Sequence, residues 1–242
     1  MIRLKSLVAR PMARVRLICV PFAGAGAVAF RPWAKLLPAH VEAFAVQLPG
    51  REDAIAQVPL TDWHTMRAEL IDAVSTLPPL PTAIFGHSLG AVIGLELARW
   101  LQRAAPGYLL HLFVSGRPWP GRETSPTSGG AEQSDTELMR SLDERYGSLA
   151  TSLSHPEIRA VAMQALRADL QLLDSYRYIP MAPLGCPLTA FSGSLDPTTT
   201  LDDMNAWRAE STGPFQLLEM QGDHFFIESQ RTIVVSHVAS RL

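Results

Sequence analysis

The chain has 242 residues, of which 47% are hydrophobic and 18% charged, and its formal net charge at pH 7 is -2. This length and composition favour one large globular domain. They argue against disorder, a coiled coil, and binding to nucleic acid or an anionic membrane. The two cysteines, Cys19 and Cys186, lie in apolar stretches without metal-ligand spacing. That pattern predicts buried thiols in a reducing cytoplasm and no metal site.

The N-terminal stretch is basic, and no acidic residue precedes Glu42. A basic stretch before an apolar run resembles a secretory signal. Pro21 and the glycine turn at Gly24 and Gly26 interrupt this run, however, so a strand followed by a turn is favoured. No run reaches the ~20 apolar residues of a membrane span. Residues 1–13 are expected to form a flexible tail.

Apolar runs alternate with helix-period segments through the first half of the chain. Proline and glycine punctuate the boundaries, and Thr61 is a plausible N-cap of the longest helix before residue 80. The expected elements are a strand at Val15–Val20, a short helix or turn at Phe30–Leu37, a strand at Ala43–Leu48, a helix at Asp62–Leu77, a strand at Thr82–Gly86, a helix at Leu89–Arg103 and a strand at Tyr108–Ser115.

The alternation breaks after the fourth strand. Residues 117–134 are rich in Gly, Ser, Pro and Thr and predict an exposed, mobile loop. Helices at Asp135–Tyr146 and His155–Tyr176 follow with no strand between them, so residues 117–183 are interpreted as a helical lid inserted in one domain, 1–242. The remaining expected elements are a strand at Pro187–Gly193, a helix at Leu201–Glu210, a strand at Phe215–Met220 and a helix at Phe226–Arg241. This order predicts an α/β fold with a mostly parallel sheet and helices on both faces.

One pentapeptide carries the chemistry. Gly86-His87-Ser88-Leu89-Gly90 lies where an apolar strand gives way to a helix. Gly-x-Ser-x-Gly in that place is the nucleophile elbow of the α/β-hydrolase fold, in which a sharp turn lifts the serine hydroxyl above the sheet edge. The helix that begins there directs its free N–H groups toward the same point. Ser88 is therefore the candidate nucleophile.

A serine hydroxyl needs a base, and the base needs an orienting acid. In this fold the chain order is Ser, then Asp or Glu, then His, each after a later strand. Asp196 in "SGSLDP" and His224 in "QGDHFF" fall where that order requires. The other histidines lie in expected helices, at their edges, in a strand or inside the elbow, where the side chain of His87 should project away from the Ser88 hydroxyl.

An oxyanion formed by the attack needs two N–H donors. We expect them from the backbone of Leu89 and from Ala23 in "PFAGAGA", with Phe22 as second choice. The same loop imitates a dinucleotide fingerprint, Gly24-x-Gly26-x-x-Ala29. A true dinucleotide fingerprint also has an acidic residue about 20 residues further on, at the end of the second strand. This chain has Gln47-Leu48 there, which argues against a dinucleotide site. No cofactor is expected.

With these residues in place, the chain from about Arg16 onward resembles the type II (external, editing) thioesterases of nonribosomal peptide and polyketide synthesis. The resemblance rests on "VPFAGAGA", "QLPGRE", "FGHSLGA", "SGRPWP", "LRADLQLLDSYRY", "CPLTAFSGSLDP" and "GDHFFI". The chain departs from the family pattern at Ala54, where another arginine is frequent, at Asp223, where glycine is common, and in loop 121–134. None of these is a triad position.

The resemblance implies hydrolysis of acyl, aminoacyl or short peptidyl thioesters from the phosphopantetheine arm of a carrier domain, which is the expected partner. A small-ester or fatty-acyl thioesterase of the same fold is the alternative, and a non-catalytic binding module is a third reading. Arg51 and Arg117 are expected to be exposed and are candidates for phosphate or carrier contact, although solvated surface is the simpler interpretation for either one. A monomer is expected by default.

Overall fold

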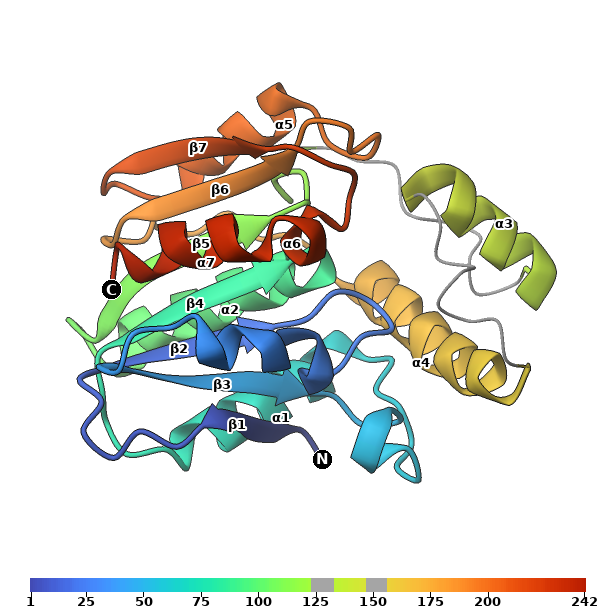
Figure 1. Cartoon of the computed structure of the whole chain (residues 1–242), viewed down its shortest axis with the longest axis horizontal. Helices are drawn as coiled ribbons and strands as arrows, with labels where there is room; N and C mark the ends of the chain where they lie inside the picture. Colours follow the sequence, from blue (N-terminus) through green and yellow to red (C-terminus); the bar gives the residue numbers. More distant parts are fainter. Residues whose placement is uncertain (123–132, 147–155) are drawn as a thin grey trace.

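A computed structural model of the chain describes residues 1–122, 133–146 and 156–242, and these form one sheet of seven strands (Figure 1). The strand order is β1-β3-β2-β4-β5-β6-β7, with β1 antiparallel to β3 and every other pair parallel. The strands are β1 Arg3–Val8, β2 Val15–Val20, β3 Val41–Gln47, β4 Thr82–His87, β5 Leu109–Ser115, β6 Leu188–Gly193 and β7 Phe215–Met220. The predicted α/β-hydrolase architecture is confirmed.

Helices cover both faces of the sheet and create two separate apolar cores (Figure 1). On one face lie α1 Trp63–Ser75, α2 Leu89–Ala104, α5 Leu201–Asn205 and the 3-10 helix η4 Ala206–Glu210. On the other lie the 3-10 helix η1 Ala27–Lys35, α6 Phe226–Ser229 and α7 Arg231–Ala239. The short 3-10 helix η2, Glu52–Ala54, follows β3. Because both faces are covered, the central strands are buried along their whole length, which accounts for their continuous apolar sequences.

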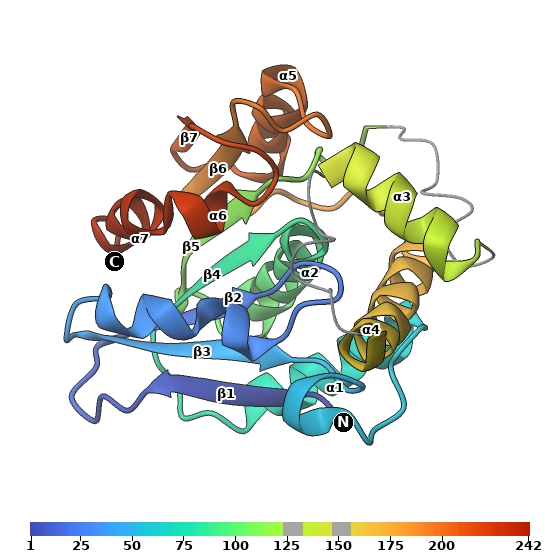
Figure 2. The same ribbon diagram turned by 45° about the vertical axis from the view of Figure 1, so that its right-hand side comes forward.

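Two helices lie outside these layers. α3 Asp135–Tyr146 and α4 Pro156–Ser175 stand beyond the carboxyl ends of the parallel strands (Figures 1 and 2). They belong to the segment 117–183 that the sequence analysis interprets as a lid. Residues 123–132, most of the predicted mobile loop, and residues 147–155 lie outside the described residues.

The expectation of a flexible tail over residues 1–13 is wrong for its central part. Residues Arg3–Val8 form the antiparallel edge strand β1, paired with β3 from Arg3↔Gln47 to Val8↔Ala43. Ile2 is buried, its N–H donates to the Glu69 carboxylate, and Lys5 bonds to Asp53. Two of the basic residues in this stretch, Arg3 and Lys5, are thus polar positions of an edge strand, where charge discourages pairing with other chains.

Smaller differences concern helix ends. The N-cap of α1 is Asp62, whose carboxylate accepts the N–H of Thr65 at 2.7 Å, and not the predicted Thr61. The helix expected at Leu201–Glu210 tightens into a 3-10 turn after Asn205, and the last helix is interrupted at Gln230. Within the described residues, no helix is both long and apolar enough to cross a membrane.

Candidate active site

The backbone of Ser88 has the strained geometry expected of a nucleophile elbow. Its φ is 55° and its ψ is -117°, and its N–H donates to the carbonyl of Ser115 at 2.8 Å. The two flanking glycines are required by space. A Cβ on Gly86 would lie 2.0 Å from the carbonyl oxygen of Gly90, and a Cβ on Gly90 would lie 2.1 Å from that of Val20. The elbow can therefore form only with glycine at both positions.

Neighbouring strands bring the candidate acid and base together. The loops after β6 and β7 are joined by backbone hydrogen bonds, Ser194 N–H to the Met220 carbonyl at 2.8 Å and Leu195 N–H to the Gly222 carbonyl at 2.9 Å. Across these loops, Nδ1 of His224 lies 2.7 Å from Oδ2 of Asp196. A carboxylate only accepts, so Nδ1 carries the proton, and Nε2 is left free to accept one.

Thr198 completes the setting of Asp196, a role the sequence analysis missed. Its N–H and its hydroxyl both donate to Oδ1, at 2.9 and 2.6 Å. Burial alone would raise the pKa of Asp196, but the hydrogen bond and charge of His224, together with the Thr198 bonds, lower it below its ordinary value. Asp196 is thus a carboxylate at neutral pH. The signal was present in "DPTTT", since a hydroxyl two residues after an aspartate commonly forms such a turn.

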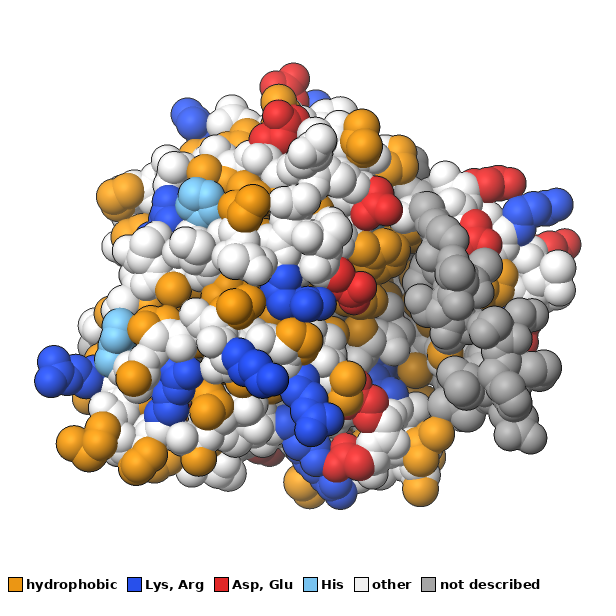
Figure 3. Space-filling model, in the orientation of Figure 1, with side chains coloured by type: hydrophobic (Ala, Val, Ile, Leu, Met, Phe, Trp, Pro, Cys, Tyr) orange, Lys and Arg blue, Asp and Glu red, His pale blue; other side chains and the backbone are white. Residues whose placement is uncertain are grey.

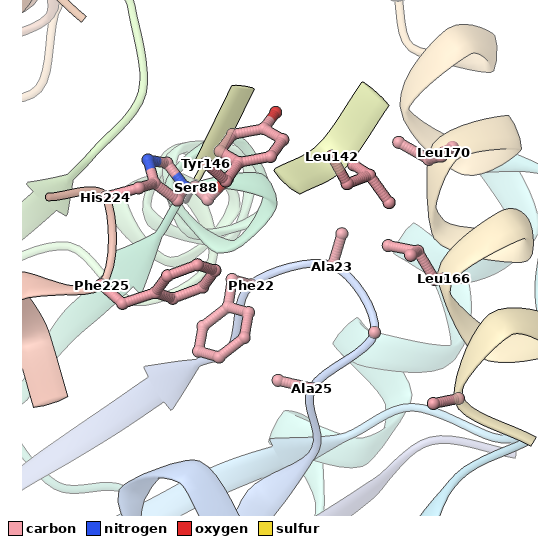
Figure 4. Close-up of a pocket in the computed structure, with 12 residues that line it drawn as sticks. Phe22, Ala23, Ala25, Ser88, Leu142, Tyr146, Leu166, Leu170, His224 and Phe225 are labelled. Carbon is pink, nitrogen blue, oxygen red and sulfur yellow. The ribbon is translucent and has the colours of Figure 1, made fainter. Parts of the chain in front are cut away.

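Ser88 and His224 lie on one wall of an apolar cavity of about 160 Å³ (Figure 4). Leu142 of α3 and Leu166 and Leu170 of α4 face them across it. The cavity is therefore built from the sheet edge on one side and from the inserted helices on the other.

The described structure shows no hydrogen bond between Ser88 and His224. In acyl-transfer sites this bond often tightens only when the substrate is bound.

Two aromatic side chains confine His224. Tyr146, at the end of α3, has its ring centroid 4.6 Å from that of His224. His87 lies 4.9 Å away on the buried side, with Nδ1 2.9 Å from the Ser115 hydroxyl. Burial, and then the neighbouring His224, hold the pKa of His87 well below its ordinary value. His87 therefore stays neutral beside the candidate base and adds no competing positive charge.

The expected oxyanion loop lies beside the elbow. Phe22, Ala23, Gly24 and Ala25 all line the cavity with Ser88. The absent side chain of Gly90 is what lets this loop approach the start of α2, because a Cβ there would also lie 2.7 Å from the Pro21 carbonyl oxygen. Leu89 is the first residue of α2, so its N–H has no partner within the helix.

The same loop rejects a dinucleotide. The N–H of Ala27 donates to Oε1 of Gln47 at 2.8 Å, and that of Val28 donates to the carboxylate of Glu52 at 3.1 Å. A Cβ on Gly26 would lie 2.4 Å from Glu52. A carboxylate thus occupies the place where a pyrophosphate would have to lie at the start of the helix.

Neither arginine proposed for partner contact is free at the surface. Arg51 is buried, and both of its Nη atoms bond to the carboxylate of Asp169 in α4. Arg117 is half-buried, and its carbonyl accepts the indole N–H of Trp207 at 2.7 Å. The expectation of exposed contact residues is therefore wrong for Arg51, because a buried acid 118 residues away pairs with it.

A second hollow, of about 410 Å³, opens between β1 and η1. Lys and Arg side chains gather over this part of the surface (Figure 3). Lys5, which lines the hollow, is bonded to Asp53, which lines it too. Among the described residues, no group of three His, Cys, Asp or Glu side chains could hold a metal ion. The candidate nucleophile Ser88 and the candidate base His224 line the first cavity and not this hollow.

Comparison with known proteins agrees with this geometry. A family model described as the thioesterase domain matches residues 15–242. The chain belongs to the thioesterase family. It is 34% identical over 235 residues to the gramicidin S biosynthesis protein GrsT of Aneurinibacillus migulanus, covering 95% of this chain and 90% of that protein.

Solved structures show the same likeness over nearly the whole thioesterase. The RedJ thioesterase of the prodiginine pathway in Streptomyces coelicolor has a TM-score of 0.88 at 32% identity, with 97% of this chain and 92% of that chain covered. The type II thioesterase BorB from the borrelidin cluster has a TM-score of 0.86 at 34% identity, covering 99% and 97%. The enzyme is a thioester hydrolase, of the type II editing class found in nonribosomal peptide and polyketide pathways.

Proposed function

We propose that Ser88, His224 and Asp196 form the catalytic triad of this thioesterase. The observation that carries the proposal is the hydrogen bond of 2.7 Å between Asp196 and His224. His224 in turn lies on the same cavity wall as Ser88, whose backbone is strained. Asp196 fixes the tautomer in which Nε2 accepts a proton, and its charge stabilises the imidazolium that results. Asp223, the adjacent acid, instead accepts the N–H of Phe225 at 2.9 Å.

The reaction follows from these positions. Ser88 Oγ attacks the thioester carbonyl carbon while Nε2 of His224 takes the hydroxyl proton. The tetrahedral intermediate collapses, the C–S bond breaks, and the departing sulfur takes the proton from His224. Water then attacks the Ser88 ester and gives a proton to His224, which passes it to Oγ as the free acid leaves.

The negative oxygen of each tetrahedral intermediate is stabilised by the backbone N–H groups of Leu89 and Ala23, with Phe22 as the alternative to Ala23. The support is positional. Leu89 follows the nucleophile at the beginning of α2, and Ala23 belongs to a loop that Gly90 allows to approach the same helix end. Donors fixed by the fold need no reorganisation during the reaction, which is the source of their effect.

The substrate in this proposal is an acyl, aminoacyl or short peptidyl group on the phosphopantetheine arm of a carrier domain. The similarity to GrsT and BorB supports a synthase partner. The cavity supports an apolar acyl group, since its far wall is formed by leucines of α3 and α4. These two helices are proposed to act as the lid over the bound acyl chain.

We further propose that the enzyme works in the reducing cytoplasm as a monomer within a single domain. Both cysteines are free and buried. One chain supplies every residue of the proposed triad and oxyanion hole, so a second copy is not required.

The test compares acyl release from a loaded carrier domain with release from coenzyme A carrying the same group, followed by intact mass. Ser88→Ala should lower the rate at least about 10³-fold, and Asp196→Asn about 10³- to 10⁴-fold. Both variants should keep the circular dichroism spectrum of the wild type. Retention of more than a few per cent of the rate by Ser88→Ala would contradict the triad. Faster hydrolysis of the coenzyme A thioester than of the carrier-bound thioester would favour a small-molecule thioesterase.

A further inference from the structure

A buried ion pair connects the inserted helix α4 to the loop after β3. Arg51 and Asp169 are 4% and 1% exposed. Nη1 of Arg51 lies 2.5 Å from Oδ2 of Asp169, and Nη2 lies 2.7 Å from Oδ1. This two-pronged contact fixes the angle between the partners as well as their separation.

The same two side chains hold the loop that carries Ala23. The N–H of Gly24, directly after Ala23, donates to Oδ2 of Asp169 at 2.7 Å. Nη1 of Arg51 donates to the carbonyl of Ala25 at 3.0 Å. Gly24 has a φ of 79°, and a Cβ there would lie 3.5 Å from Cβ of Leu166 in α4. The loop is thus held by Asp169 and Arg51, two side chains that do not belong to it.

The buried pair of Arg51 and Asp169 is better explained by the position that it gives the loop than by a gain in stability. A buried ion pair costs desolvation and is weak evidence for stability, because an apolar pair can often replace it. This pair, however, places a donor and an acceptor on consecutive residues of the loop, which an apolar pair could not do. Arg51 also compensates a carboxylate that would otherwise oppose negative charge developing at Ser88.

We propose that Asp169 and Arg51 are positioning residues for the oxyanion hole, and that they make its geometry depend on the position of α4. This inference rests on the proposed role of Ala23. Oδ2 of Asp169 accepts from both the loop and Arg51, so a shift of α4 moves the donor that follows Ala23. Misplacement of a catalytic group by about 1 Å is enough to lower a rate about 100-fold.

The test uses Asp169→Asn with Glu210→Gln as matched control. Glu210 forms the comparable buried pair with Arg99, at 2.9 Å and 3% and 2% side-chain exposure, and does not line the cavity. Both substitutions remove one charge from a buried pair and keep its shape. At a temperature where both variants are folded, Asp169→Asn should lose 10- to 100-fold in kcat with KM within threefold. Glu210→Gln should keep kcat within threefold.

A second readout separates positioning from stability. An alkylboronic acid bonds to Ser88 and places an oxygen in the hole, whereas a non-cleavable thioether analogue of the substrate does not. Asp169→Asn should weaken boronate inhibition at least tenfold and leave thioether binding unchanged. The double variant Arg51→Met with Asp169→Leu, which buries no charge, should show the same losses even if Asp169→Asn does not fold.

Wild-type kcat and boronate affinity in the double variant, or in Asp169→Asn, would overturn the inference. Equal losses in Glu210→Gln would overturn it as well, since the effect would then be structural. Failure of the proposed triad gives a different result: wild-type enzyme itself would be insensitive to the boronate, and Ser88→Ala would remain active.

Discussion

The backbone of Ser88 lends itself to a direct measurement of strain. Its φ of 55° and ψ of -117° are values that residues with a side chain avoid, at a cost of about 1–3 kcal/mol. Glycine adopts them freely. Comparing Ser88→Gly with Ser88→Ala removes the hydroxyl from both proteins and leaves one difference, the Cβ atom.

The size of the effect comes from a matched position. Ala91 is fully buried in α2, three residues from Ser88, with ordinary helical backbone. Ala91→Gly, made in the Ser88→Ala protein, should cost about 0.5–1 kcal/mol of backbone freedom plus about 0.8 kcal/mol for the buried carbon. At position 88 the relief of strain offsets a similar loss. Ser88→Gly should therefore be as stable as Ser88→Ala or more so, and about 2 kcal/mol better than the Ala91→Gly protein.

Thermal unfolding followed by calorimetry resolves this difference. For a chain of this size, 1 kcal/mol shifts the melting temperature by about 2–4 °C, so the two glycine variants should differ by about 4–8 °C. None of the three proteins has a nucleophile, so turnover cannot affect the result. Equal melting temperatures for the two glycine variants would mean that position 88 stores no strain, and the elbow interpretation would fail.

Two further predictions concern pH and substrate length. Burial, and to a lesser degree the charge of Arg241, lower the pKa of His111 to about 4 from 6.5. Below pH 6.5 the unfolded chain therefore takes up a proton that the folded chain cannot, and stability falls by up to about 3 kcal/mol as the pH drops toward 4. The free energy of unfolding in urea should fall less between pH 7 and pH 4.5 for His111→Gln than for the wild type. Equal falls would refute the lowered pKa of His111. The cavity of about 160 Å³ is close to the size that holds benzene, so acyl chains of up to about six carbons should fit. Ala162→Phe should fill part of it and lower the hexanoyl-to-acetyl ratio of kcat/KM at least tenfold, at about 0.8 kcal/mol per excluded methylene; an unchanged ratio on N-acetylcysteamine thioesters would show that the chain binds elsewhere.

The triad candidates were accessible from sequence because each depends on a local pattern. An apolar strand ends just before Ser88, another before Asp196 and a third before His224, and parallel strands end at the same sheet edge. The structure brings Asp196 and His224 into direct contact and places Ser88 on the wall of the same cavity.

The features that sequence reasoning missed depend on distant partners. From its sequence context Arg51 is expected at the surface, because its partner Asp169 lies 118 residues further along the chain. A signal existed, since Asp169 occupies the helical spacing shared by the apolar Ala162, Leu166 and Leu173. An acid on an apolar stripe needs a buried partner. Strand β1 was missed because the alternation of polar and apolar residues from Ile2 to Lys5 is short and lies at the chain end.

The origin of the cavity walls has a consequence for how such an enzyme could acquire new substrates. The turn that carries Ser88 requires glycine on both sides, because a single methyl group at Gly86 or Gly90 would collide with the backbone. The opposite wall, with Leu142, Leu166 and Leu170, is carried by helices outside the sheet. In the proposed function, the leucines that contact the acyl chain and the three triad residues thus lie in separate stretches of the chain, although Asp169 of α4 also positions the oxyanion loop. If the proposed function holds, substitutions at Leu142, Leu166 and Leu170 should change the acyl preference while the reacting atoms keep their places.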